Sequence, residues 1–175
     1  SGEDQLRQRV AYALAQIFVI SMQNDNVGSD PRATAHYLDM LADKGLGSYR
    51  ELLEAVSLHP QMGRYLTSLG NRKEDTRTGR VPDENYAREI MQLFSIGLFE
   101  CNEDGTFFFN DTAPTEIYTP ADIAGLARVF TGWSWACPVA PTASTTVNTA
   151  STTCFGNGSV TLSGGTAQSY PDRSM

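Results

Sequence analysis

The stretch of sequence that decides the fold runs from Asp83 to Gly97 and reads DENYAREIMQLFSIG. Its apolar residues recur three or four positions apart, which is the spacing of one face of an α-helix. That face is formed by Tyr86, Ile90, Leu93, Phe94 and Gly97. The pattern predicts a helix from Asp83 to about Phe99 that packs this face against a hydrophobic core.

The other face of this helix is polar and carries the candidate catalytic residues Asn85, Arg88, Glu89 and Gln92. Side chains three or four residues apart are neighbours on a helix, so these four form one cluster. The cluster could hold a substrate, orient a loop or supply the carboxylate of Glu89 for proton transfer. The alternative, which we favour, is a buried structural network in which carboxylates hold Arg88, with Glu84 one turn away. No nucleophile, histidine or metal motif accompanies this face.

Start and stop signals mark further helices on both sides of this stretch. Thr119 to Asp122 and Ser48 to Glu51 each have the pattern of a capping box, and Asp30 is an N-cap followed by proline. The expected helices span about Asp4 to Met22, Asp30 to Gly45, Ser48 to His59, Pro60 to Gly70 and Thr119 to Gly132, with a polar turn from Asn24 to Ser29. Helices joined by short loops predict an all-α multi-helix bundle.

The composition changes after Trp133, where Ser, Thr, Gly and Ala begin to dominate. We therefore expect a helical domain over residues 1–133 and a long irregular insertion or linker over residues 134–175. Cys137 and Cys154 bracket this tract, and a disulfide between them would stabilise the closed loop by roughly 3 kcal/mol. The alternative is two unpaired thiols in a cytosolic protein. If the disulfide forms, the expected compartment is periplasmic or extracellular.

The charge balance excludes two classes of partner. Thirteen basic residues against 20 acidic ones give a net charge of −7. Nucleic-acid binding needs a concentrated basic surface, and adsorption to anionic lipid needs the same, so neither partner is expected. No apolar run approaches the roughly 18 residues of a membrane span, so no span is expected.

A candidate metal site follows the central helix. Glu100, Asn102, Asp104 and Asp111 stand at positions 1, 3, 5 and 12 of a calcium-binding loop, and Gly105 stands at position 6. The pattern departs from the usual one because Glu replaces Asp at position 1 and Asp replaces Glu at position 12. Calcium binding is one hypothesis for this loop. Because of these departures, the favoured hypothesis is an ordinary Asp-Gly turn.

The two histidines and the two tryptophans have weaker signals. His59, before Pro60, is expected at a helix end, matched in charge to the C-terminal dipole, and His36 is expected to be partly exposed. Trp133 and Trp135 are expected to anchor the core or a loop, and an exposed pair that binds carbohydrate is the alternative.

Several stretches resemble a bacterial family known as domain of unknown function 1800, and they occur in that family's order. They are LRQRVAYALAQIFVIS (Leu6 to Ser21), YRELLEAVSLHPQMGRYL (Tyr49 to Leu66), LGNRK (Leu69 to Lys73), PDENYAREIMQLFSIGLFE (Pro82 to Glu100), DGT (Asp104 to Thr106) and YTPADIAGLARVFTGW (Tyr118 to Trp133). Asp83 and Gln92 stand where the family usually has Asn and Glu.

The resemblance implies a large, often exported bacterial protein with no established activity. Family members are typically longer than this chain, and a segment rich in His, Asp and Lys usually follows the region near Trp133. No such segment appears before Met175. We therefore expect that the chain is a piece of a longer protein, whose remaining part is one partner.

The favoured function is a non-catalytic assembly or surface-interaction module of an exported protein, which would bind other extracellular proteins or polysaccharide. One alternative is a hydrolase that uses Glu89 and Arg88 and is completed by residues beyond Met175. Another alternative is a module that binds calcium or carbohydrate. The residues alone do not decide whether the chain is an enzyme.

Overall fold

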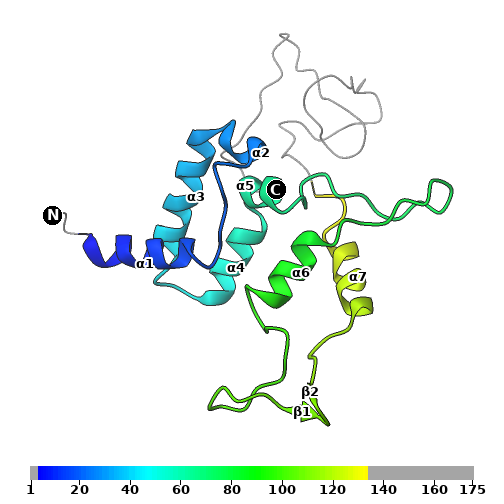
Figure 1. Ribbon diagram of the computed structural model, residues 1–175. Coiled ribbons are helices and arrows are strands. Elements are labelled where there is room, and N and C mark those ends of the chain that lie inside the picture. Colours follow the sequence, from blue (N-terminus) through cyan, green and yellow to red (C-terminus); the bar gives the residue numbers. More distant parts are fainter. Residues whose placement is uncertain (1–3, 134–175) are drawn as a thin grey trace.

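The computed structural model describes residues 4–133 (Figure 1). Within that range seven helices contain 48% of the residues, and one short hairpin forms a two-stranded sheet. The elements are α1 (Gln5–Ala15), α2 (Asp25–Gly28), α3 (Pro31–Lys44), α4 (Tyr49–Ser57), α5 (Pro60–Tyr65), α6 (Asn85–Gln92), β1 (Phe109–Asn110), β2 (Ala113–Pro114) and α7 (Pro120–Val129). The fold is therefore helix-rich, with a small antiparallel sheet that the all-α prediction did not include. The insertion expected over residues 134–175, with Cys137 and Cys154, lies outside the described residues.

The hydrophobic core has two parts, and α6 contributes to both. The larger part joins side chains from α3, α4, α5 and α6, among them the fully buried Tyr37 and Met62. The smaller part joins Ala87 of α6 to Tyr118 and to the buried side of α7. Figure 1 shows α6 and α7 side by side, in agreement with their direct contacts. Tyr86, Ile90 and Phe94 of the predicted apolar face pack in the larger part. Ala87 and Met91 reach the smaller part, and Leu93, which was predicted on the core face, is 59% exposed.

Helix α6 is shorter than the sequence pattern predicted, because it ends at Gln92 and not near Phe99. Beyond it the N–H of Phe94 donates to the carbonyl of Glu89, five residues back, which widens the last turn. The turn directs Phe94 into the core, where its ring lies 5.1 Å from that of Phe18. Gly97 then takes a positive φ of 81°, a conformation that glycine adopts without strain. The burial of Phe94 therefore sets the end of this helix.

Helix α1 also ends early, at Ala15 and not at Met22. Phe18 is fully buried, whereas its neighbours Ile17 and Val19 are 46% and 41% exposed. Residues 16–18 form a turn in which the Phe18 N–H still donates to the Leu14 carbonyl, and Val19 and Ile20 belong to no regular element. The apolar run predicted as the second half of a helix is therefore a turn and an irregular connection that place the Phe18 ring in the core.

Of the three predicted N-terminal helix caps, two form in the structure and one does not. The Asp30 carboxylate accepts from the Ala33 N–H, and the Thr119 capping box forms with both of its bonds, so these two starts are confirmed. The capping box predicted at Ser48 is wrong, because that side chain makes no cap hydrogen bond.

Two other predicted element boundaries are wrong. The segment from Asn24 to Ser29, predicted as a polar turn, contains the short helix α2. The side chain of Val27 in this helix is buried, and its burial holds the segment against the core. Helix α5 starts at Pro60 as predicted but ends at Tyr65, well before Gly70. No helix among residues 4–133 is long and apolar enough to cross a membrane.

Candidate functional site

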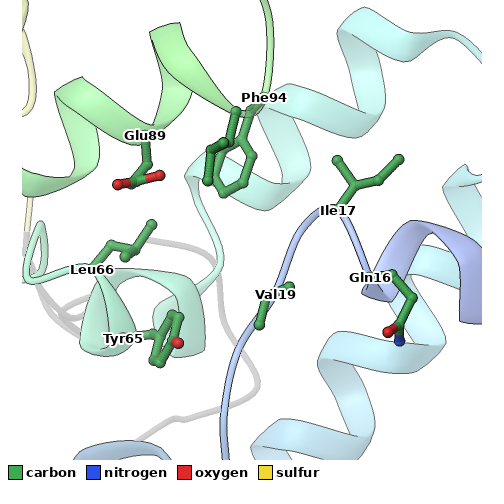
Figure 2. A pocket seen from close by; sticks show the side chains of 8 residues that line it. Gln16, Ile17, Val19, Tyr65, Leu66, Glu89 and Phe94 are labelled. Carbon is green, nitrogen blue, oxygen red and sulfur yellow. The ribbon is translucent and has the colours of Figure 1, made fainter. Parts of the chain in front are cut away.

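A pocket of about 380 Å³ lies where α6, the end of α5 and the connection after α1 meet (Figure 2). This volume is in the range of pockets that hold small molecules or side chains. The lining consists of Gln16, Ile17, Val19, Tyr65, Leu66, Glu89, Leu93 and Phe94. Three segments far apart in the sequence therefore supply its walls.

The walls are mainly apolar, and part of the apolar rim faces solvent. Phe94 forms the buried floor, at 3% exposure, and packs on Phe18 behind it. At the rim Leu93 is 59% exposed, and Ile17 and Val19 are nearly half exposed. Exposed apolar side chains grouped around a concave surface are typical of a binding site rather than of a plain solvated surface.

Glu89 is the one charged residue in the lining. Its Oε2 atom is buried and has no hydrogen-bond partner among residues 4–133. In Figure 2 the Glu89 carboxylate and the side chain of Leu66 point toward each other. A buried polar oxygen without a partner is unfavourable, so the carboxylate of Glu89, which lines the pocket, is incompletely satisfied.

The structure separates Glu89 from the other candidate residues of α6. Arg88 Nη2 donates to Glu84 Oε2 at 3.2 Å, which confirms the predicted pair, but both side chains are exposed. Asn85 is exposed and Gln92 is half-buried, and neither lines the pocket. These residues therefore do not form the buried network that we favoured, because the α6 side that carries Arg88 and Asn85 faces solvent.

Few side chains in the described lining of the pocket could take part in catalysis. Glu89 and Tyr65 are its only acid–base side chains, and the described lining holds no histidine, serine or cysteine. A hydrolase site needs a nucleophile or an activated water beside a second positioned group. The chemistry that this lining supports is binding of an apolar group that also donates a hydrogen bond.

The predicted calcium loop forms a tight turn. Asp104 Oδ1 accepts from the hydroxyl and from the backbone N–H of Thr106, and these bonds, the hydroxyl one first, lower the pKa of the Asp104 carboxyl. Gly105 has a φ of 83°, and its N–H donates to the Asn102 carbonyl. These features agree with the Asp-Gly turn.

The carboxylates of this loop are not gathered. Glu100, Asp104 and Asp111 do not form a cluster that could hold an ion, and no such cluster of three occurs among residues 4–133. Asp111 lies in the turn between β1 and β2. Calcium binding by Glu100, Asn102, Asp104 and Asp111 stays a prediction without geometric support.

Sequence reasoning missed a pair of histidines. His36 Nδ1 and His59 Nε2 lie 3.0 Å apart, and the two rings stack. The Gln61 N–H donates to His59 Nδ1, so this nitrogen carries no proton and His59 Nε2–H donates to His36. Burial, and secondly the neighbouring His36, lower the pKa of His59 from 6.5 to about 4. His59 is therefore neutral.

The expectation that His59 matches a helix C-terminal dipole is thus wrong, because the ring caps the N-terminus of α5. The signal was present in the sequence, since a residue just before a proline that starts a helix occupies the N-cap. Next to it, Nε2 of the buried Gln61 side chain lies within hydrogen-bond distance of Val27 O, Asp30 O and Thr34 Oγ1, and its two N–H groups are shared among these three acceptors. This amide joins α5 to α2 and α3.

Two further residues with candidate chemistry lie apart from the pocket. Trp133 is 38% exposed, and its possible carbohydrate partner Trp135 lies outside the described residues. Cys101 is exposed and unpaired. Neither residue joins a built site in the part of the chain that the structure describes.

Comparison with known proteins agrees with the resemblance seen in the sequence. Residues 1–171 match the model of a family described as protein of unknown function (DUF1800). No curated protein and no solved structure matches the chain. Because the match covers nearly the whole chain, the chain belongs to this family of proteins of unknown function.

Proposed function

We propose that this chain is a non-catalytic binding module of an exported bacterial protein, and that it holds the aliphatic part of a partner's side chain in the pocket beside α6. The observation that carries the proposal is the pocket itself, whose apolar rim of Ile17, Val19 and Leu93 faces solvent. Burying such a rim would be favourable by about 25 cal/mol for each Å² of apolar surface removed from water. The described lining has only two side chains that could act as an acid or a base, Glu89 and Tyr65, which favours binding over catalysis.

The test is a titration with 1-hexanol, a neutral apolar probe, followed by ¹H–¹⁵N NMR. We expect shifts concentrated at the lining residues, and we expect Leu93→Asp to weaken binding at least tenfold because it places a charge on the rim. Leu6→Asp is the matched control, since Leu6 is 69% exposed on α1 and lies outside the lining. Shifts scattered over the surface, or equal binding by both variants, would refute the pocket as a binding site.

The proposed export rests on the sequence. Cys137 and Cys154 bracket the Ser/Thr-rich tract, and disulfides persist in periplasmic and extracellular compartments. Alkylation of the protein, purified without reductant from its native host and denatured before labelling, provides the test. We expect one alkyl group, on Cys101, before reduction and three after it. Three groups before reduction would count against the disulfide and against this argument for export.

A further inference from the structure

We propose that the occupant of the pocket is a lysine side chain of the partner, whose ammonium group pairs with the carboxylate of Glu89. This inference rests on the proposed function, because it names the chemistry of the group that the pocket holds. It follows from two features of the lining, an unpaired acidic oxygen and the balance of charge around it.

The first feature is the environment of Glu89. The Oε2 atom is screened from water yet accepts no hydrogen bond from residues 4–133. The walls next to it are the apolar side chains of Leu66, Leu93 and Phe94. An alkyl chain that ends in a positively charged donor fits this lining, because its methylene groups contact the apolar walls while its head group pairs with the Glu89 carboxylate.

The second feature is that residues 4–133 supply no cation to the lining of this pocket. The described lining contains no lysine, arginine or histidine. Arg88, the next residue on α6, points its guanidinium at Glu84 on the exposed side of the helix. With a net charge of −7 on the chain, a cationic group is also attracted from a distance.

The count of acceptors favours an ammonium group over a guanidinium group. Glu89 is the one carboxylate of the described lining, and of its other polar side chains, Gln16 and Tyr65, Gln16 lies across the pocket from it in Figure 2. An ammonium group carries three donors, whereas a guanidinium group carries five in a rigid fork. A guanidinium group bound here would therefore leave more donors without a partner in the lining than an ammonium group.

The experiment compares hexylamine, 1-hexanol and hexylguanidine at pH 7 by NMR titration. We expect hexylamine to bind the wild-type protein at least tenfold more tightly than 1-hexanol and more tightly than hexylguanidine. In Glu89→Gln the advantage of the amine over the alcohol should fall below threefold, while binding of 1-hexanol is retained. Glu54→Gln is the matched control, since it removes the same charge from an exposed residue of α4 outside the pocket.

The outcomes separate this inference from the proposed function. Equal binding of amine and alcohol, or an unchanged preference in Glu89→Gln, would overturn the ammonium site while leaving the apolar pocket in place. Tighter binding of hexylguanidine would overturn the choice of lysine. If none of the three probes binds, both the inference and the proposed function fail.

Discussion

Lowering the pH from 7 to 4 should destabilise the fold through the buried imidazole of His59. This ring is 4% exposed and stays neutral in the folded protein, where its pKa is about 4 in place of 6.5. In the unfolded chain it binds a proton as the pH falls through 6.5. Between these two values the unfolded state holds more protons than the folded state, so stability falls as the pH falls.

The magnitude follows from the difference between the two pKa values. A shift of 2.5 pKa units, from 6.5 to about 4, corresponds to about 3 kcal/mol at 1.36 kcal/mol per unit. The groups that face His59 are His36, Tyr37 and the Gln61 N–H. The carboxyls whose pKa is lowered, such as that of Asp104, begin to lose their contribution only as the pH approaches 3.8, so they add little to the loss above about pH 5.

The assay is urea denaturation followed by circular dichroism at several pH values between 7 and 4. The wild-type free energy of unfolding should fall by about 3 kcal/mol across this range. His59→Asn keeps an N-cap acceptor but cannot titrate, so its loss should be under about 1 kcal/mol. His36→Gln is the control and should keep most of the pH dependence, because burial is the larger cause of the shift. A pH dependence in His59→Asn as steep as that of the wild type would refute the reasoning.

Three further predictions concern stability at pH 7, each measured as a change in the free energy of unfolding. Gln61→Met should destabilise by about 2 kcal/mol because it leaves buried acceptors, including Thr34 Oγ1, without their donor; no loss would mean that water replaces the amide. Thr119→Ala should cost about 1 kcal/mol because it removes a formed cap, whereas Ser48→Ala should change stability by less than about 0.5 kcal/mol. Equal losses in these two variants would contradict the cap assignments. Gly97→Ala should cost about 1 kcal/mol from backbone strain alone, since no atom lies within 4 Å of an added Cβ; a stabilised variant would contradict the positive φ.

The sequence by itself determined the helical segments among residues 4–133 other than α2, and where several of these helices begin. The caps at Asp30 and Thr119 act over three residues, so their hydrogen bonds can be read from adjacent positions in the chain. The apolar stripe of α6 is equally local, because its period of three or four residues is a property of the helix itself. The family resemblance depends on the same stretches.

Only the tertiary structure decided where α1 and α6 end and what their side chains meet. The helices end near Phe18 and Phe94 because a core built from distant segments accepts the rings of both residues. The pairing of His36 with His59 joins positions 23 residues apart, and the walls around Glu89 come from three separate segments. Helical spacing grouped Glu89 with Arg88, yet the fold turned one side chain into a pocket and the other to solvent. Packing between distant segments, which no local pattern records, made that distinction.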